Sequence, residues 1–247
     1  MKPYEFLAPL YDRLTADVDY FSFADYYESL ITQKGEKTPK IVLDLACGTG
    51  SLTRILADKG YSMIGVDRSP EMLSQAMEKS GGEILYLQQS LTELDLYGTV
   101  DAVICSLDGL NYIPPDELLE AVRRVFLFLH PGGVFAFDLN SPEKLLAQDG
   151  QLYFDEGEDF LCLWRCSFDP AERACRYDFD LFTKQGKLWA RQRETHLEYA
   201  HTIEQMQKIL TDAGFVDVFI SGDRKNGPPD LGEGRIFVAA TRPGEDR

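Results

Sequence analysis

The 247-residue sequence lacks any long apolar run, which argues against a membrane-spanning helix. No segment approaches the roughly 18 uninterrupted apolar residues that a span needs. The first residues also lack the apolar stretch of a secretory signal peptide. We therefore expect no membrane segment and a cytoplasmic location. A chain of this length can bury enough apolar surface for one large domain or two small ones.

Basic clusters are also missing. Only 25 Lys and Arg stand against 41 Asp and Glu, for a formal charge of −16, and the densest basic run is Arg191-Gln192-Arg193. Nucleic-acid affinity draws heavily on Lys and Arg contacts with phosphates. The composition therefore argues against a nucleic-acid partner. Net charge alone does not exclude a local basic groove.

Cysteines are few and odd in number, at positions 47, 105, 162, 166 and 175. Cys162 and Cys166 would share one face of a strand, but no His lies nearby to complete a zinc site. We expect no bound metal, and reduced thiols as in a cytosolic protein.

The most informative stretch is a strand that turns into a helix over glycines. Ile41–Leu45 predicts a buried strand, Gly48-Thr49-Gly50 breaks it, and Leu52, Ile55 and Leu56 then recur at helical spacing. Glycines let the backbone approach a ligand closely, and the free N–H groups of a helix start point at it. This pattern predicts a nucleotide-like cofactor at the carboxyl edge of a parallel sheet.

The residues around the turn narrow the choice of cofactor. A dinucleotide fingerprint needs a third small residue where Thr53 stands, and no Gly-Lys-Ser/Thr follows as in a phosphate-binding loop. Two acids, Asp44 and Asp67, end the first two predicted strands. An acid at the end of the second strand can accept both hydroxyls of a free ribose.

Four segments, in order, resemble the motifs of class I S-adenosylmethionine-dependent methyltransferases. They are Asp44–Gly50, Gly65–Leu73, Asp101–Leu107 and Leu129–Phe137, within residues 41–138. The sequence departs from the family pattern at Ala46, which replaces the first glycine of the first motif. It departs again at Ser90, where an acid or amide often follows the third strand.

The resemblance implies S-adenosyl-L-methionine as cofactor and a small-molecule acceptor with an N or O nucleophile. Asp67 would bind the ribose, and the residues after it would border the adenine. The cofactor-binding residues implied are Tyr11, Asp44, Ala46, Cys47, Gly48, Gly50, Asp67, Arg68, Met72, Ser90, Leu91 and Leu107.

The alternation of apolar runs and helical patterns predicts an α/β fold with a Rossmann-like, doubly wound, mostly parallel sheet. With the resemblance, seven strands are expected, the last two as an antiparallel hairpin. Strands are expected near 41–45, 61–66, 84–88, 100–106, 133–138, 215–220 and 235–240, and helices near 50–59, 70–80, 115–129 and 202–213. Residues 1–35 predict two amphipathic helices, and Tyr11–Tyr20 resembles the N-terminal lid of small-molecule methyltransferases. A purely structural Tyr11 in the core is the alternative.

Residues 152–199 have a different pattern, with period-2 segments separated by turn signals at Asp169-Pro170 and Gln185-Gly186. They predict a three-stranded antiparallel sheet. We expect residues 1–140 and 200–247 to form the cofactor-binding core and residues 141–199 an inserted subdomain, a substrate lid or a dimer surface. This order of parts resembles that of sugar-nucleotide N-methyltransferases and related uncharacterised bacterial enzymes.

Three residues are candidates for catalysis. Asp108 and Tyr112 follow the fourth strand, where an acceptor would enter, and His196 would reach the site if the inserted sheet folds over it. Asp108 as a helix cap and His196 as a structural residue are the alternatives. The segment Ser106–Tyr112 lacks an Asn-Pro-Pro-Tyr-type motif for amide methylation.

Four residues of the inserted sheet could bind the substrate. Trp164 and Trp189 could wall a pocket, and Arg165 and Arg191 could bind an anionic group. A purely structural aromatic face is the alternative. Two other functions stay open, a methyltransferase acting on RNA or protein and a regulator that binds S-adenosylmethionine without turnover.

Overall fold

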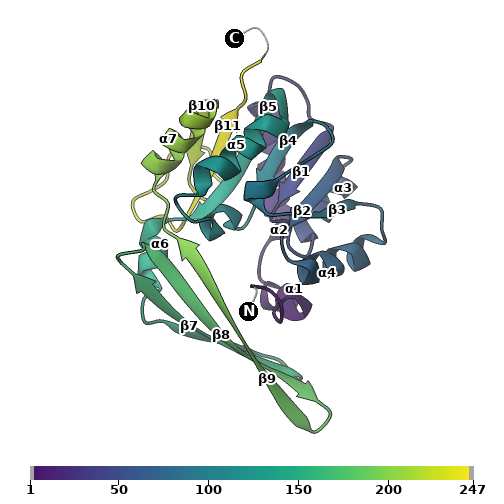
Figure 1. Cartoon of the computed structure of the whole chain (residues 1–247), viewed down its shortest axis with the longest axis vertical. Coiled ribbons are helices and arrows are strands. Elements are labelled where there is room, and N and C mark those ends of the chain that lie inside the picture. Colours follow the sequence, from purple (N-terminus) through teal and green to yellow (C-terminus); the bar gives the residue numbers. More distant parts are fainter. Residues whose placement is uncertain (1–2, 245–247) are drawn as a thin grey trace.

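The computed structural model describes residues 3–244 and contains one large and one small β-sheet (Figure 1). The large sheet has seven strands in the order β10-β11-β5-β4-β1-β2-β3. Its strands are β1 (Ile41–Leu45), β2 (Ser62–Asp67), β3 (Leu85–Gln88), β4 (Val100–Cys105), β5 (Leu129–Asn140), β10 (Val216–Ser221) and β11 (Arg235–Thr241). Only β11 runs antiparallel to its neighbours, β5 and β10. The predicted seven-stranded fold is confirmed. The predicted lid includes residues 1–2 and the predicted core includes residues 245–247, which lie outside the described residues.

Helices cover both faces of this sheet because its central strands are apolar on both sides. On one face, buried residues of α5 (Leu118–Phe128) and α7 (Ile203–Ala213) pack with Val103 of β4. On the other, α2 (Tyr20–Gln33) and α3 (Ser51–Asp58) pack with Ala102 and Ile104. A further helix, α4 (Pro70–Ser80), connects β2 to β3. The sheet is therefore doubly wound.

The small sheet has four antiparallel strands, not three. It comprises β6 (Leu152–Glu156), β7 (Phe160–Asp169), β8 (Ala174–Gln185) and β9 (Leu188–Tyr199), preceded by α6 (Pro142–Ala147). The strand that the prediction missed is β6, an edge strand exposed at every residue, so no buried face imposes an alternating pattern on it. Figure 1 shows this sheet projecting from the core as a long arm.

The N-terminal segment (residues 3–15) contains less helix than predicted. It forms a short 3-10 turn, η1 (Ala8–Leu10), and a single helical turn, α1 (Tyr11–Leu14). The amides of Tyr4, Phe6 and Leu7 donate to the carboxylate of Glu194 on β9. The Glu194 carboxylate therefore binds backbone N–H groups that a longer N-terminal helix would use for its own hydrogen bonds. In Figure 1, α1 lies between the core and the arm.

One further boundary differs from the sequence prediction. The helix expected over 115–129 begins at Leu118, after Pro114 and Pro115, and the preceding residues form a 3-10 turn, η3 (Gly109–Tyr112). Within residues 3–244, no helix has both the length and the apolar composition needed to cross a membrane.

Candidate active site

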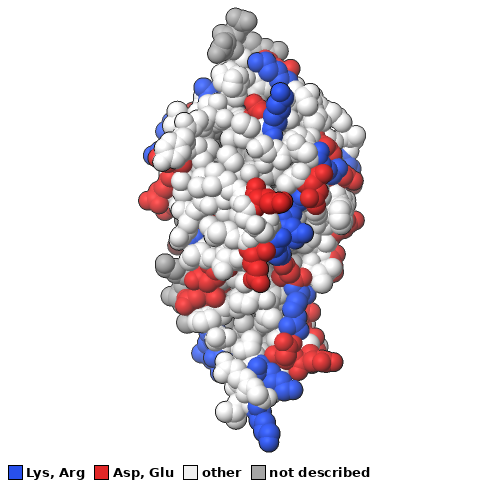
Figure 2. Space-filling model, turned by 90° about the vertical axis from the view of Figure 1, so that its right-hand side faces the viewer, with Lys and Arg blue, Asp and Glu red and all other residues white. Residues whose placement is uncertain are grey.

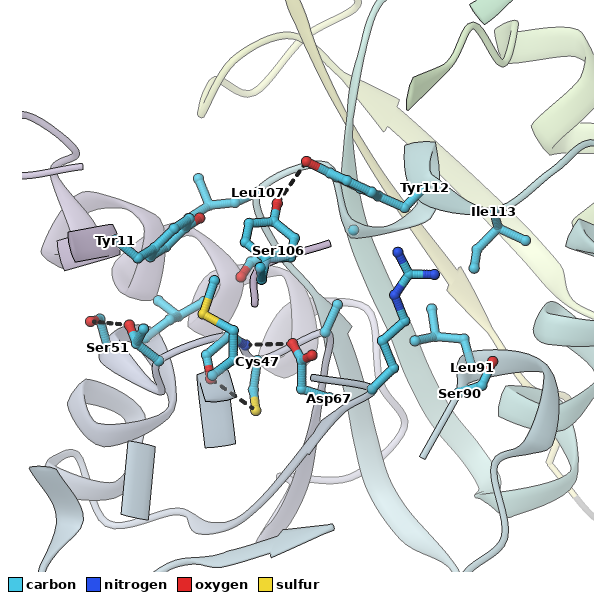
Figure 3. Close-up of a pocket in the computed structure, with 18 of the residues that line it drawn as sticks. Tyr11, Cys47, Ser51, Asp67, Ser90, Leu91, Ser106, Leu107, Tyr112 and Ile113 are labelled. Carbon is cyan, nitrogen blue, oxygen red and sulfur yellow. Dashed lines mark hydrogen bonds between the residues drawn. The ribbon is translucent and has the colours of Figure 1, made fainter. Parts of the chain in front are cut away.

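A first cavity lies at the carboxyl ends of β1, β2 and β4, under the N-terminal segment (Figure 3). Most of the predicted cofactor-binding residues line it. They are Tyr11, Ala46, Cys47, Gly48, Asp67, Arg68, Met72, Ser90, Leu91 and Leu107. The loops that follow successive parallel strands meet at one edge of the sheet, and therefore residues far apart in the chain share this cavity.

The two glycines of the turn have different surroundings. Gly48 has φ +55°, and a Cβ there would meet no atom within 4 Å, so its backbone faces open space in the cavity. Gly50 has φ +71°, and a Cβ there would lie 2.6 Å from the Tyr86 hydroxyl. Gly50 therefore allows tight packing behind the turn, whereas Gly48 leaves room for a ligand.

Asp67, at the end of β2, holds the glycine turn in place. Its buried carboxylate accepts hydrogen bonds from the amides of Gly48 at 2.9 Å and Ser69 at 2.8 Å (Figure 3). Burial raises the pKa of Asp67, and the two amide hydrogen bonds lower it. Each carboxylate oxygen keeps a lone pair for a ligand hydroxyl.

Asp44 lies behind the turn and does not line the cavity. One of its oxygens accepts from the Thr53 hydroxyl at 2.6 Å, and the other has no hydrogen-bond partner among residues 3–244. Burial raises the pKa of Asp44 to about 7. Of the predicted cofactor-binding residues, Asp44 and Gly50 are thus the two that the structure keeps away from the cavity surface.

The N-terminal segment closes the first cavity on the side opposite the sheet. Asp12 accepts from the Thr49 hydroxyl at 2.5 Å and pairs with Lys79 of α4 at 2.6 Å. This segment supplies Tyr4, one of eight lining residues that the sequence prediction missed. The additional lining residues are Tyr4, Tyr20, Thr49, Ser51, Leu52, Ser106, Gly109 and Ile113. Several adjoin predicted residues in the motifs, whereas Tyr4 is placed by contacts with the distant residues Glu194 and Tyr112.

A second cavity adjoins the first and reaches the inserted sheet. Four residues, Tyr4, Tyr11, Leu107 and Tyr112, line both cavities. Residues of β7, β8 and β9 form its far side, including Trp164, Tyr177, Phe179 and His196. The structure therefore brings together four residues predicted for substrate binding or catalysis, namely Asp108, Tyr112, Trp164 and His196.

Asp108 occupies the N-cap position of η3, as the alternative interpretation expected, but its side chain makes no capping hydrogen bond. Its carboxylate pairs with Arg235 of β11 at 2.8 Å. Leu107 and Asp108 have φ of 52° and 61°, and their amides donate to Asp138 of β5 at 2.8 and 3.1 Å. Burial raises the pKa of Asp108, and the positive charge of Arg235 lowers it.

Tyr112 and His196 lie close to the boundary between the cavities. The Tyr112 hydroxyl is 2.6 Å from that of Tyr4 (Figure 3). The buried His196 ring is 3.0 Å from the Glu194 carboxylate and lies against the rings of Tyr4 and Phe179. Burial raises the pKa of Tyr112. His196 is thus part of the contact that holds the N-terminal segment.

The structure does not bring Arg165, Trp189 and Arg191 to either cavity. Arg165 and Arg191 each pair with Asp180 at 2.6 Å on the opposite face of the arm. Trp189 is half-exposed next to the β8–β9 turn. Trp164 and Arg165 point to opposite faces because side chains alternate along a strand, and only the Trp164 face meets the cavity.

Three neighbouring residues in the second cavity were not predicted. The Lys144 ammonium donates to the Asn140 side-chain oxygen at 2.7 Å, and the Asn140 side-chain nitrogen donates to Glu198 at 2.7 Å. Burial raises the pKa of Glu198 to about 8, with the charge of Asp108 adding to the rise. The period-2 spacing of Glu194, His196 and Glu198 places all three on one face of β9 and could have indicated Glu198.

The described residues also constrain other ligands. Residues 3–244 contain no group of three or more His, Cys, Asp or Glu placed to hold a metal ion. On the face shown in Figure 2, Lys and Arg are interspersed with Asp and Glu rather than gathered in one basic patch.

The fold and the first cavity define a Rossmann-like enzyme that binds a nucleotide-type cofactor at the carboxyl edge of its sheet. Residues 42–133 match the family model described as "Methyltransferase domain". The chain is 31% identical over 244 residues to the Bacillus subtilis protein named "Putative methyltransferase YqeM", covering 97% of both chains. The chain belongs to the class I S-adenosylmethionine-dependent methyltransferases, and S-adenosylmethionine is its cofactor.

Solved structures share the whole architecture. An S-adenosylmethionine-dependent methyltransferase from Clostridium acetobutylicum has a TM-score of 0.85 and 28% identity, over 98% of this chain and all of that chain. The sugar N-methyltransferase KedS8 from Streptoalloteichus has a TM-score of 0.79 and 23% identity, over 94% and 92% of the chains, which indicates a common fold.

The residues present fit this cofactor. Gly48 leaves open space beside the backbone, and Asp67 offers carboxylate lone pairs to ribose hydroxyls. Met72, Leu91 and Ile113 supply apolar surface for an adenine. When bound, S-adenosylmethionine supplies an electrophilic methyl group.

Proposed function

We propose that this enzyme methylates a small molecule, at a nitrogen or oxygen atom, that binds in the second cavity. The main observation in support is the shared boundary of the two cavities, lined by Tyr4, Tyr11, Leu107 and Tyr112. A methyl group must pass between two ligands held close together and in line, so a donor site and an acceptor site need a common opening.

The form of the second cavity supports a small acceptor. The N-terminal segment, the inserted sheet and the core enclose it on three sides, as its lining by Leu7, Trp164 and Asn140 illustrates. Such enclosure suits a metabolite better than a polymer, whose chain must continue beyond the site on both sides. The acidic charge and the interspersed basic residues also argue against RNA.

We assign the roles of the residues accordingly. Asp67 binds the ribose hydroxyls, Gly48 lets the backbone approach the cofactor, and Arg68, Met72, Ser90 and Leu91 border the adenine. The additional lining residue Tyr4 joins Tyr11 in covering the cofactor. Tyr112 and Trp164 contact the acceptor, while Asp108, paired with Arg235, and His196, bound to Glu194, shape the acceptor cavity.

The first test is to measure where a labelled methyl group goes. The protein is incubated with S-adenosylmethionine carrying an isotopic methyl label and with separate small-molecule, RNA and protein fractions. We expect label in the small-molecule fraction. Label found only in RNA or protein would contradict the proposal.

The cofactor site is tested by Asp67→Ala. Losing a charged hydrogen-bond acceptor should weaken binding of S-adenosylhomocysteine roughly 10- to 100-fold or more in titration calorimetry. Asp58→Ala, at the end of α3 and outside the first cavity, is the matched control and should bind normally. Unchanged affinity in a folded Asp67→Ala protein would place the ribose elsewhere.

A further inference from the structure

Two side chains in the second cavity that can carry opposite charges lack an ionic partner. Lys144 of α6 and Glu198 of β9 form no ion pair with any other described residue. The amide of Asn140 lies between them and hydrogen-bonds to both, at 2.7 Å each. Burying a charge without an opposite charge costs free energy, so this arrangement favours a ligand that supplies the missing partners.

The other charged groups of the second cavity are already paired. Arg235 binds the carboxylates of Asp108 and Asp138 from one side. His196 lies against Glu194, which also accepts amides of the N-terminal segment. Lys144 and Glu198 are therefore the two side chains of the described lining that can carry a charge and stay available to a ligand.

Glu198 lies near the boundary with the first cavity, because its charge helps to raise the pKa of the boundary residue Tyr112. The side chain of Asn111, next to Tyr112, donates to the carbonyl oxygen of Tyr199, next to Glu198, at 2.9 Å. This bond sets β9 against η3, which carries the boundary residue Tyr112. Lys144 lies on α6, beyond Asn140. A group bound by Glu198 is thus on the cofactor side of the second cavity.

We propose that the acceptor is an amine that also carries an anionic group a few bonds away, with the amine held by Glu198 and the anion by Lys144. This inference rests on the proposed function, because it names the acceptor class of the same cavity. The amine and the anion are expected to lie close together because the single amide of Asn140 bridges Lys144 and Glu198. The rings of Trp164, Tyr177 and Phe179 cover the rest of the molecule.

The proposed methyl transfer balances with the groups that the protein, the cofactor and the acceptor supply. A bound ammonium gives a proton to the Glu198 carboxylate, which frees the nitrogen lone pair. The new carbon–nitrogen bond forms as the bond from the methyl carbon to sulfur breaks, and sulfur keeps that electron pair. The nitrogen carries the positive charge until the product loses a proton.

The anion can be a carboxylate or a phosphate, because an ammonium binds both. Calorimetric titrations of the protein saturated with S-adenosylhomocysteine distinguish them. The probes are tyrosine, glucosamine 6-phosphate and their analogues without the anion, tyramine and glucosamine. We expect at least one compound with both groups to bind roughly tenfold or more tightly than its analogue. Equal affinity within both pairs overturns the inference.

Two variants separate the groups. Lys144→Gln should lower the affinity for the preferred dual compound roughly 10- to 100-fold and leave the affinity for its amine-only analogue unchanged. Glu198→Gln should weaken both compounds. Lys208→Gln, which removes an exposed lysine of α7, is the control and should change neither. A Lys144→Gln protein that still prefers the dual compound contradicts the inference.

A second measurement reports on Glu198 directly. The groups facing Glu198 are Asp108, Lys144, Arg235, Tyr4, Tyr112 and Tyr177, with the thiols of Cys166 and Cys175 behind it. Burial raises the pKa of Glu198 to about 8, so it holds a proton near neutral pH. An ammonium beside it favours the carboxylate, and binding should therefore release close to one proton.

Calorimetry in buffers of different ionisation enthalpy measures this release. We expect about one proton at about pH 7, much less above about pH 9, and none in Glu198→Gln. Equal release by wild type and Glu198→Gln overturns the role of Glu198. These outcomes differ from those that would contradict the proposed function. That proposal would fail if the protein did not bind S-adenosylhomocysteine, or if the methyl label appeared only in RNA or protein.

Discussion

At the scale of single residues, the glycine turn divides its tasks between two positions. Gly48 faces the first cavity, whereas Gly50 packs against Tyr86. Both have positive φ, where an L-residue is strained by roughly 1–2 kcal/mol. Substituting Gly48 should therefore cost about as much stability as substituting another glycine of this conformation. The effect on ligand binding should be specific to Gly48.

We predict that Gly48→Ala weakens binding of S-adenosylhomocysteine roughly tenfold or more, because its Cβ projects into the space that the cofactor needs. The matched control is Gly81→Ala at the end of α4. Gly81 has φ +62° and likewise no atom within 4 Å of a Cβ, but lies outside the cavity. Both variants should unfold at similarly reduced temperatures. Equal cofactor affinity in the two variants would refute the role of Gly48.

The sequence predicts residues that lie directly after strands better than residues whose direction depends on a distant contact. Asp67 and Gly48 belong to a local strand–turn–helix pattern and line the cavity as expected. Arg165 and Arg191 could not be placed from spacing alone, because their partner Asp180 lies on another strand. Glu198 shares one face of β9 with His196, but this spacing does not reveal that the face is buried against the core, and Glu198 was therefore missed.

At the scale of elements, the central strands of the core, such as β1 and β4, were predictable because buried parallel strands are continuous apolar runs. The exposed strand β6 has no such constraint and was missed. The N-terminal segment was assigned too much helix because the spacing of its aromatic residues mimics an amphipathic face. Its conformation depends instead on Glu194, which is 190 residues away along the chain from Tyr4.

We predict that Glu194→Gln loosens the N-terminal segment. The carboxylate accepts from the amides of Tyr4 and Leu7 at 2.8 Å each, and a glutamine would direct an N–H₂ group at these donors. Since Tyr4 lines both cavities, S-adenosylhomocysteine affinity should fall roughly tenfold.

Affinity is measured by titration calorimetry, with Glu172→Gln as the control. Glu172 is an exposed residue in the β7–β8 turn of the same arm. Undiminished affinity in Glu194→Gln would show that the segment is held by its other contacts, such as Asp12 with Lys79.

At the scale of the whole molecule, the core, the N-terminal segment and the arm meet at the two cavities. We predict that S-adenosylhomocysteine slows amide hydrogen exchange in residues 4–15 and also in β9, which does not line the first cavity. The ligand stabilises Tyr4 and Tyr11, and the bonds to Glu194 transmit that stability to the arm. Protection confined to the core loops would contradict this coupling.

The arm leaves and rejoins the core at one point. The side chain of Asn111 hydrogen-bonds to the backbone of Asn140, where β5 ends, and to the carbonyl oxygen of Tyr199, where β9 ends. The side-chain amide of Asn111 thus holds together the two places where the chain passes between the core and the arm. The residues between these two places can diverge, lengthen or be exchanged by recombination while the cofactor-binding core keeps its sequence. A lineage built on this arrangement can acquire new acceptors by changing one segment of a gene.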